Sequence, residues 1–382
     1  MRIGVAKETA TGECRVALVP EIVARLIKSG LEVAVETGAG AAASHPDADY
    51  QSAGARLAAS AAEALQADLV AKVQRPSLAE AEQLRRGGAL ICFLQPAQDP
   101  QLLQRLVQRE ATVFSMDLIP RISRAQKMDA LSSMSTVAGY KAVLLAAAAL
   151  PRFFPLLMTA AGTIAPAKVL VLGGGVAGLQ AIATARRLGA VVDAFDVRPK
   201  VKEEVQSLGA GFIGMPTDES LETAGGYAKE VAASFLDRER QVLRDPVRAA
   251  DVVICTAMVP GKRAPVLVTA DMAKAMKPGS VIVDIAADMG GNCEWTEPGR
   301  EVVKGGVRVI GAVNLASTMP YHASQMYSRN VAALLGLLIK DGTLHLDWDD
   351  EITAAACVAH AGKSRLTPAV ATAPASAAAA AP

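Results

Sequence analysis

The chain has 382 residues, of which 51% are hydrophobic, and its formal net charge at pH 7 is +1. This length predicts two to three domains with a large apolar core, and the balanced charge argues against a nucleic-acid-binding face. The five cysteines show no CxxC spacing and the four histidines show no metal-ligand spacing. We therefore expect reduced thiols, no bound metal and a cytoplasmic protein, since the charged start MRIGVAKE does not resemble a signal peptide.

Strand-like and helical patterns alternate through the first third of the chain. The predicted strands cover residues 3–6, 31–36, 68–73, 89–94 and 112–116. The predicted helices cover residues 20–29 and 57–66. This alternation is typical of a parallel sheet with helices on both faces, so the first domain is expected to be α/β. It contains no glycine-rich fingerprint of its own.

Charged residues follow two of these strands. Lys7, Glu8 and Arg15 lie around the first strand-to-helix loop, and Lys72 lies at the end of another strand. Strand ends border the ligand crevice of an open parallel sheet, so these cations could contact an anionic ligand. Solvated or salt-bridged loop charges explain the same pattern equally well.

A polar loop comes next, between residues 119 and 132. It contains Arg121, Arg124, Gln126, Asp129 and Ser132. A glutamine and a serine can bind a carboxamide, which presents both a donor and an acceptor, while an Arg–Asp pair orients them. An interdomain loop with ordinary ion pairs is the alternative interpretation.

The most apolar stretch covers residues 142–162, and its length is near that of a membrane span. Pro151, Arg152 and Pro155 interrupt its middle, and alanine supplies much of its apolar character. We therefore expect a buried helix followed by an interdomain connection.

Residues 168–198, KVLVLGGGVAGLQAIATARRLGAVVDAFDVR, carry the most specific motif. A strand-like run at residues 169–172 leads into Gly173, Gly175 and Gly178, which are in GxGxxG register, and an amphipathic helix follows. The first glycine permits the tight turn, the second lets a pyrophosphate approach the backbone, and the third lets helix and strand pack closely. The free N–H groups and the helix dipole favour the negative charge.

A second predicted strand, residues 191–195, ends at Asp196. A carboxylate there can accept hydrogen bonds from both hydroxyls of an adenosine ribose and repels a 2′-phosphate, so Asp196 favours NAD over NADP. Arg198 weakens that preference, because an arginine can contact a 2′-phosphate or stack on adenine. A purely structural glycine turn is the alternative, but strand, turn, helix, strand and acid follow in order within about thirty residues, the length of one βαβ unit.

Further strands are predicted at residues 211–214, 252–256, 280–285 and 307–312. The long segment after the first of them contains Gly225, Gly226 and Tyr227, which can act as a hinge and a lid over a bound ring, or belong to an ordinary exposed loop. The strand end at Ala257 and Met258 would border the nucleotide crevice, as would residues 288–292.

An apolar helix at residues 324–340 is expected to return to the first domain. The predicted fold is therefore α/β, with two Rossmann-like doubly wound parallel-sheet domains and a cleft between them. We place the first domain at residues 1–132 plus 318–361 and the second at 138–315. The alanine- and proline-rich residues 362–382 are expected to form a flexible tail.

Taken together, these motifs resemble the NAD(H)-binding subunits of proton-translocating NAD(P) transhydrogenases, within the alanine dehydrogenase/transhydrogenase superfamily. The resemblance covers about residues 1–360, and its most specific segments are PRISRAQKMDALSS, GGGVAGLQAIATARRLGA, ETAGGYAKE and PGKRAPVL. It implies a Re/Si-specific oxidoreductase that passes hydride between NADH, bound by this chain, and NADP+ on a partner beta subunit. It also implies a homodimer on the cytoplasmic face of the inner membrane, with membrane-spanning partner subunits that translocate protons.

The resemblance also assigns roles to particular residues. The residues implied near the reacting nicotinamide are Arg121, Gln126, Asp129, Ser132 and Tyr227. The residues implied to bind the rest of the dinucleotide are Gly173, Gly175, Val176, Ala177, Gly178, Asp196, Val197, Arg198, Gly226, Ala257 and Met258.

Alanine dehydrogenase is the related alternative. Arg15, Lys72 and Asp288 match the pattern of that enzyme, which must hold a carboxylate and move a proton. Its acid/base histidine would fall at Gln95, and a glutamine exchanges no proton at neutral pH, which disfavours amine oxidation. A non-catalytic NAD-binding module is the remaining alternative.

Overall fold

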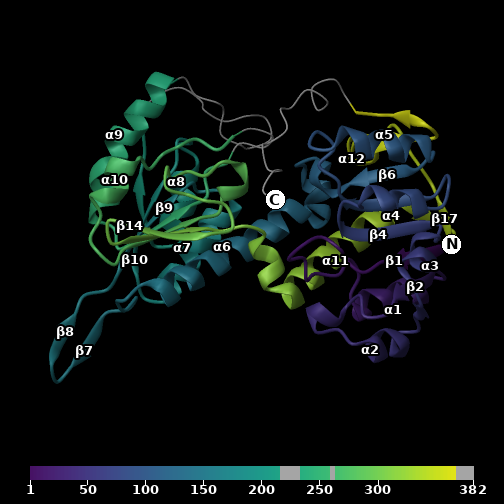
Figure 1. Ribbon diagram of the computed structural model, residues 1–382, viewed down its shortest axis with the longest axis horizontal. Coiled ribbons are helices and arrows are strands. Elements are labelled where there is room, and N and C mark those ends of the chain that lie inside the picture. The colour runs from purple at the N-terminus through teal and green to yellow at the C-terminus, as the bar shows by residue number, and fades with distance from the viewer. Residues whose placement is uncertain (216–232, 259–262, 367–382) are drawn as a thin grey trace. The chain divides into compact units, whose positions relative to one another are not determined.

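The computed structural model describes residues 1–215, 233–258 and 263–366. The chain divides into two compact units (Figure 1). Unit 1 contains Met1–Met134 and the described residues from Ala316 onward, and unit 2 contains Ser135–Leu315. Both units are α/β, as the sequence predicts.

Unit 1 is built on an eight-stranded sheet with the spatial order β19-β18-β6-β5-β4-β1-β2-β3. Its strands are β1 (Arg2–Val5), β2 (Glu32–Glu36), β3 (Arg56–Ala58), β4 (Leu69–Gln74), β5 (Ala89–Phe93), β6 (Thr112–Ser115), β18 (Cys357–His360) and β19 (Lys363–Ser364). The strands from β3 to β6 are parallel, and β18 and β19 are antiparallel. The order β3-β2-β1-β4-β5-β6 is that of a doubly wound fold, whose ligand crevice lies where the order reverses, between β1 and β4.

The helices of unit 1 cover its sheet and fix the loops at the strand ends. They are α1 (Pro20–Lys28), α2 (Asp47–Ser52), α3 (Ala61–Leu65), α4 (Leu78–Gln83), α5 (Pro100–Gln108), α11 (Pro320–Leu338) and α12 (Glu351–Ala356), with the 3-10 helices η1 (Ala41–Ala43), η2 (Met116–Leu118), η3 (Ser123–Met128) and η5 (Leu315–Thr318). A small hairpin, β16 (Ile339–Lys340) and β17 (Thr343–Leu344), follows α11.

Helix α11 holds the loop after β1 through two regularly placed serines. The hydroxyl of Ser324 accepts a hydrogen bond from the Val16 backbone N–H at 3.0 Å, and that of Ser328 accepts from Val19 at 3.1 Å. Buried backbone N–H groups require such partners. The predicted return of this apolar helix to the first domain is confirmed.

Unit 2 is built on a seven-stranded sheet with the order β11-β10-β9-β12-β13-β15-β14. Its strands are β9 (Lys168–Leu172), β10 (Val191–Phe195), β11 (Gly211–Ile213), β12 (Val252–Cys255), β13 (Val281–Asp284), β14 (Glu301–Lys304) and β15 (Val307–Gly311). All are parallel except β14, which pairs antiparallel with β15. The same 3-2-1-4-5-6 order recurs from β11 to β15, and its switch point lies between β9 and β12.

Alternate residues of the unit 2 strands enter two apolar cores, one on each face of the sheet. Val169 and Val171 of β9 pack beneath α6 (Ala130–Ala149), α7 (Val176–Arg187) and α8 (Val201–Ser207). Leu170 and Leu172 pack beneath α9 (Ala233–Ala249) and α10 (Ala270–Lys274) on the other face (Figure 1). Such uninterrupted apolar strands are typical of a parallel sheet covered on both sides.

The structure differs from the sequence predictions in three places. The predicted helix at residues 57–66 is instead the short strand β3 followed by α3, and the antiparallel strand β14 was not predicted. The stretch after α6 is not an interdomain connection but a hairpin of β7 (Leu157–Thr159) and β8 (Gly162–Ile164), which projects from unit 2 (Figure 1).

Helix α6 alone among the described helices has the length and apolar composition of a membrane span. Core helices of globular domains pass the same test. Its side chains at Ala142, Val143 and Ala146 are fully buried against the sheet of unit 2. The apolar character of α6 is therefore explained by packing within the protein.

Candidate functional site

The glycine turn lies at the switch point of unit 2, between β9 and α7. Gly173 has a φ of +101°, and a Cβ atom there would lie 2.7 Å from Oγ1 of Thr256. Thr256 in turn donates hydrogen bonds to the carbonyl oxygens of Leu172 (3.1 Å) and Gly173 (2.9 Å). Both the backbone angle and the close neighbour require glycine at this position.

The two other glycines differ in their surroundings. A Cβ atom on Gly178 would overlap the carbonyl oxygen of Gly173, so glycine is what lets α7 pack against the turn. A Cβ atom on Gly175 would meet nothing within 4 Å, which leaves its backbone open to a ligand at the start of α7. Gly175 offers no side-chain cap, so the first N–H groups of α7, including those of Val176 and Ala177, can bind an anion.

Asp196 follows β10 and faces the glycine turn. Its carboxylate accepts a hydrogen bond from the Gly174 backbone N–H at 2.7 Å. It also accepts two hydrogen bonds from the Arg198 guanidinium, at 2.9 and 2.8 Å, and one from the Arg198 backbone N–H. The structure thus brings Asp196 to the turn, as the motif predicts, and pairs its charge with Arg198.

A network that the sequence did not predict holds the strand ends beside this turn. The Asn292 side chain accepts from the Ala257 backbone N–H at 3.0 Å and donates to the Ala257 carbonyl oxygen at 2.8 Å. Asn292 is held in turn by the fully buried Asp284, which accepts from its backbone N–H at 2.7 Å. This pairing fixes the backbone of Ala257, the predicted contact residue that precedes Met258, just after the end of β12. The only sequence signal was the polar segment at residues 288–292.

Burial raises the pKa of Asp284, although the Thr296 hydroxyl and three backbone N–H groups donate to its carboxylate. Asp288 lies nearby in η4 (Ala287–Met289), and burial raises its pKa as well. Asp284 is a structural residue, since its hydrogen bonds all go to its own loop.

The predicted polar loop lies in unit 1 and leads into α6. Asp129 caps this helix: its carboxylate accepts from the Ser132 backbone N–H at 2.8 Å and from the Ser132 hydroxyl at 2.6 Å. The structure therefore brings Asp129 and Ser132 together, and their bond is that of a helix N-cap. Gln126 lies in η3 with an exposed side chain, and Arg121 is also exposed.

Two contacts fix η3 within unit 1. Asn330 of α11 donates a hydrogen bond to the Lys127 carbonyl oxygen at 2.9 Å. Arg124 forms an ion pair with Asp350, which also caps α12. Arg124 is thus engaged with α12, a partner that the sequence did not suggest.

Buried charges fill the switch point of unit 1. Lys72 of β4 is 1% exposed and lies 2.9 Å from the carboxylate of Glu80 and 3.6 Å from that of Glu8. Arg15 pairs with Glu13 through two hydrogen bonds, of 2.7 and 2.6 Å. Of the three cations that were expected to contact an anionic ligand or to pair in loops, Arg15 and Lys72 are therefore paired with carboxylates of the chain itself, while the Lys7 side chain is exposed.

The pKa values in this cluster follow from burial and charge. Burial raises the pKa of Glu8 to about 7, despite the nearby ammonium of Lys72. Burial also raises the pKa of Glu13, but the hydrogen bonds and charge of Arg15 outweigh it and lower the pKa to about 2. For Lys72, the carboxylates of Glu8 and Glu80 outweigh burial and raise the pKa.

Gln95 follows β5 at the position where the related dehydrogenases would have a histidine. Its φ of +49° is uncommon for a residue other than glycine. Asp117 holds this conformation by accepting from the backbone N–H groups of Leu94 (3.0 Å) and Gln95 (3.2 Å). The side chain of Gln95 is exposed.

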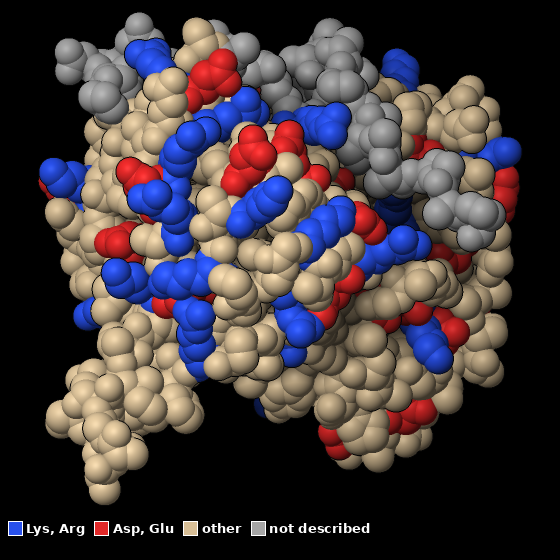
Figure 2. Space-filling view, turned by 60° about the vertical axis from the view of Figure 1, so that its left-hand side comes forward, with Lys and Arg blue, Asp and Glu red and all other residues tan. Residues whose placement is uncertain are grey.

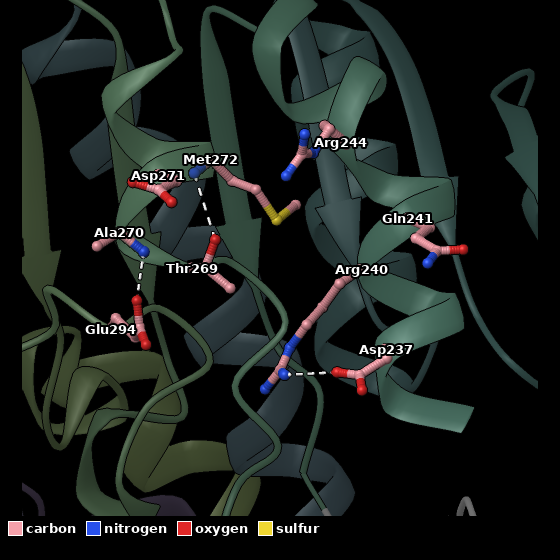
Figure 3. A pocket seen from close by; sticks show the side chains of 9 residues that line it. All are labelled: Asp237, Arg240, Gln241, Arg244, Thr269, Ala270, Asp271, Met272 and Glu294. Atoms are coloured by element: carbon pink, nitrogen blue, oxygen red, sulfur yellow. Dashed lines mark hydrogen bonds and ion pairs between the residues drawn. The ribbon is translucent and has the colours of Figure 1, made fainter. Parts of the chain in front are cut away.

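A separate cavity of about 670 Å³ lies between α9 and α10 (Figure 3). Its lining residues are Asp237, Arg240, Gln241, Arg244, Thr269, Ala270, Asp271, Met272 and Glu294. None of the residues expected to bind a nucleotide lines it. Thr269 is the N-cap of α10, since its hydroxyl accepts from the Met272 backbone N–H. The remaining predicted site residues, Gly226 and Tyr227, lie outside the described residues.

Comparisons with known proteins place this fold and glycine turn in a known family of oxidoreductases. The family model described as "Alanine dehydrogenase/PNT, N-terminal domain" matches residues 4–138, and the one described as "Alanine dehydrogenase/PNT, C-terminal domain" matches residues 142–366. The chain therefore belongs to the alanine dehydrogenase/PNT family.

Within this family the chain is similar both to transhydrogenases and to alanine dehydrogenases. It is 46% identical over 374 residues to the NAD(P) transhydrogenase subunit alpha of Cereibacter sphaeroides, covering 96% of this chain and 72% of that protein. A solved transhydrogenase structure from Sinorhizobium meliloti superposes with a TM-score of 0.84 at 41% identity, covering 97% of this chain and all of the other. A solved L-alanine dehydrogenase superposes with a TM-score of 0.82 at 29% identity, covering 97% and 98%.

Proposed function

We propose that this chain is the NAD(H)-binding subunit of a proton-translocating transhydrogenase of the Re/Si-specific type. In this role it passes hydride between NADH and the NADP+ held by a partner beta subunit. Membrane-spanning partner subunits couple the transfer to proton translocation, so the chain works at the cytoplasmic face of the inner membrane. The observation that carries the proposal is the glycine turn with Asp196, in a chain similar over nearly its whole length to a transhydrogenase alpha subunit.

The residues of unit 2 fit an NAD(H) molecule. Gly175 leaves its backbone open where a pyrophosphate would approach, and the uncapped start of α7 supplies N–H donors. Asp196 supplies the acceptor for the adenosine ribose, while Val197 and Arg198 follow it. Ala257, whose backbone Asn292 holds, and Met258 are assigned to the edge of the same crevice. When bound, the reduced nicotinamide supplies the hydride.

The polar loop of unit 1 serves the nicotinamide end. We assign Gln126 and Arg121, both exposed, to contacts with the nicotinamide, and Asp129 and Ser132 to holding the loop at the start of α6. Hydride exchange between two nicotinamides requires orientation and exclusion of water but no acid/base group. Gly226 and Tyr227 are assigned to a lid that excludes water.

Two observations disfavour an amino-acid dehydrogenase. Such an enzyme needs a free cation for the substrate carboxylate, whereas Arg15 and Lys72 are paired with Glu13 and Glu80. It also needs a proton-transfer group, which Gln95 does not provide. A nicotinamide-to-nicotinamide transfer needs neither.

We also propose that the chain forms a homodimer through the β7–β8 hairpin. Its apolar side chains are exposed, with Met158 at 80% and Leu156 at 52%, and residues 153–167 carry no charge. Figure 2 shows this hairpin as an uncharged projection. An isolated two-stranded hairpin is marginally stable in water, and exposed apolar patches mark contact sites. A second copy of the chain would cover it.

The test is a set of three measurements on the purified chain. NADH binding is followed by fluorescence, NADH formation is measured from NAD+ and L-alanine, and hydride transfer is measured after addition of an NADP(H)-binding beta subunit. We expect binding, no turnover with alanine, and transfer only with the partner. Asp196→Ala should weaken NADH binding by about tenfold or more, since hydrogen bonds to a charged group contribute about 1.5–3 kcal/mol.

Each result separates the alternatives. Sustained turnover with alanine would replace the proposal by the dehydrogenase. NADH binding without transfer in the presence of the partner would leave a non-catalytic binding module. Unchanged NADH affinity in Asp196→Ala would remove Asp196 from the ribose site.

A further inference from the structure

The hydrogen-bond acceptors of Asp196 are all in use within the chain. Its Oδ1 atom accepts from the backbone N–H of Arg198 at 2.8 Å and from Nε of the same residue at 2.9 Å. Its Oδ2 atom accepts from the Gly174 backbone N–H at 2.7 Å and from Nη2 of Arg198 at 2.8 Å. A carboxylate has about four lone-pair sites, so these four donors satisfy it. A ribose hydroxyl therefore finds no acceptor on Asp196 until one of the four donors leaves.

The burial of this pair leads to the same conclusion. The side chain of Asp196 is 5% exposed, and that of Arg198 is 13% exposed. The carboxylate is thus nearly closed to solvent by the guanidinium that pairs with it. A ligand group reaches Asp196 only when a neighbouring side chain moves.

Two of the four donors are fixed in the backbone. The turn that supplies the Gly174 N–H is held by the hydrogen bond from the Gly173 N–H to the Phe195 carbonyl oxygen, at 2.8 Å. The backbone of Arg198 is held at the start of α8, because its carbonyl oxygen accepts from the Val201 N–H at 3.2 Å. The other two donors, Nε and Nη2, belong to a long side chain with rotatable bonds. They can leave without any change in the backbone.

The two displaceable donors match the adenosine ribose in number and kind. The 2′- and 3′-hydroxyls of a ribose are neighbouring donors, as are Nε and Nη2 of a guanidinium, and either pair can bind one carboxylate. We propose that Arg198 is an internal substitute for the ribose. Its guanidinium occupies two acceptor sites of Asp196 in the free chain and gives them up to the ribose hydroxyls when NADH binds. This inference rests on the proposed NAD(H) site in unit 2.

The exchange lowers the net gain from each ribose hydroxyl. In the free chain, the guanidinium satisfies a buried carboxylate that would otherwise lack partners. When NADH binds, each hydroxyl replaces a charge-assisted hydrogen bond that already exists, so only the difference between the two bonds favours binding. Without the guanidinium, each hydroxyl fills an acceptor site that has no competing donor in the chain. Removal of Arg198 should therefore make the hydroxyls count for more.

The experiment compares NADH with 2′-deoxy-NADH, which lacks the 2′-hydroxyl of the adenosine ribose. The Kd values of both are measured for the full chain, for Arg198→Met and for Arg187→Met. Arg187 is an exposed arginine in the last turn of α7, in the same unit, and serves as the matched control. The ratio of the two Kd values is the readout. Any other contact of Arg198 with the dinucleotide is common to both ligands and cancels in this ratio.

The expected ratio depends on whether a guanidinium must leave. In the unsubstituted chain and in Arg187→Met, loss of the 2′-hydroxyl should weaken binding by about threefold, because one hydrogen bond replaces another. In Arg198→Met it should weaken binding by about tenfold or more, the usual effect of a hydrogen bond to a charged group. Arg198→Lys keeps the charge but lacks the two-donor fork, so its ratio should also exceed that of the unsubstituted chain. This variant decides the matter should Arg198→Met not fold.

A second readout follows the guanidinium itself. The NMR signal of the Arg198 Nε–H, identified by its loss in Arg198→Lys, should exchange slowly with water in the free chain. Addition of NADH should speed that exchange, because the group leaves Asp196.

Three results would overturn the inference. Equal Kd ratios in Arg198→Met and the unsubstituted chain would show that Arg198 does not compete with the ribose. An Nε–H signal that stays protected with NADH bound would show that the pair remains closed. A ratio near one in every chain would remove the 2′-hydroxyl from Asp196, although NADH still binds. A chain that binds no NADH contradicts the proposed function and this inference with it.

Discussion

At the scale of single residues, the buried charges of unit 1 are unequal in number. The three carboxylates of Glu8, Glu13 and Glu80 face the two cations Lys72 and Arg15. Burial raises the pKa of Glu8, whereas the contacts with Arg15 and Lys72 lower the pKa values of Glu13 and Glu80. Because the pKa of Glu8 is higher in the folded protein, the free energy of unfolding falls as the pH rises from about 4.5 to about 7. Because the pKa values of Glu13 and Glu80 are lower in the folded protein, the free energy of unfolding also falls when the pH drops below about 4.5.

Lys72→Met tests this balance. Removal of one partner from a buried ion pair costs about 3–5 kcal/mol, so we expect a loss of that size in the free energy of unfolding at pH 8. At pH 5.5 the loss should be smaller, because Glu80 without its ammonium has a higher pKa and becomes neutral more readily. Urea unfolding at both pH values measures it. The exposed Lys28→Met at the end of α1 is the control, and an equal loss for Lys72→Met at both pH values would contradict the account.

The capping role of Asp129 can be separated from any effect of its charge on the proposed hydride transfer. Asp129→Ala removes the N-cap of α6 and should lower the free energy of unfolding by about 1 kcal/mol. Asp129→Asn keeps a capping oxygen and should keep the stability. Slower hydride transfer in the Asn variant would then report on the lost charge alone. An unchanged free energy of unfolding in Asp129→Ala would show that the cap does not stabilise α6.

At the scale of elements, the sequence predicted the strands that are buried on both faces. The run of β9 is followed at once by the glycine turn, and that of β12 is a short, wholly apolar segment, both typical of strands in a parallel sheet. The short strand β3 was hidden in an alanine-rich pattern, and its extended form follows from pairing with β2. The hairpin of β7 and β8 was hidden by apolar composition that continues from α6.

In the candidate site, too, some features could be predicted from the sequence and others could not. The turn glycines and Asp196 were predictable because the motif is local, with fixed spacing. The network of Asp284 and Asn292 was not predictable, because it joins the loops after β12 and β13 across 35 residues of sequence, from Ala257 to Asn292. The pairing of Arg15 and Lys72 depends on contacts between strands that follow only from the tertiary fold.

The packing of α6 on α7 gives a prediction for an element. A Cβ atom on Gly139 of α6 would overlap the carbonyl oxygen of Ala177 in the first turn of α7. Backbone atoms cannot rotate away, so Gly139→Ala should separate the helices, lower the free energy of unfolding by about 1–3 kcal/mol and weaken NADH binding at the start of α7. Unfolding and NADH titration measure the two effects.

The control is Gly336→Ala in α11, where a Cβ atom would meet nothing within 4 Å. It should raise stability by about 0.5–1 kcal/mol, since alanine favours a helix over glycine, and leave NADH binding unchanged. NADH binding as tight in Gly139→Ala as in Gly336→Ala would show that the position of α7 does not depend on this contact.

At the scale of the whole molecule, two units share one strand order but differ at the switch point. In unit 2 the crevice is bordered by glycines, open backbone N–H groups and Asp196. In unit 1 the corresponding place is filled by Lys72 with Glu8 and Glu80. One doubly wound unit is therefore built to bind a dinucleotide, and the other has its crevice closed by its own side chains.

The proposed homodimer makes the last prediction. Met158 of β7 is 80% exposed, and an aspartate there would place a charge in the interface between two hairpins, where it would lose its hydration. Met158→Asp should therefore convert the dimer to a monomer of 39.5 kDa, measured by light scattering or sedimentation, while NADH binding by unit 2 persists. Val303→Asp, at an exposed apolar residue of β14 away from the hairpin in sequence, should remain dimeric. If Met158→Asp remains dimeric, the contact between the two copies lies elsewhere. If the unsubstituted chain is monomeric, the exposed hairpin binds a partner other than a second copy of the chain.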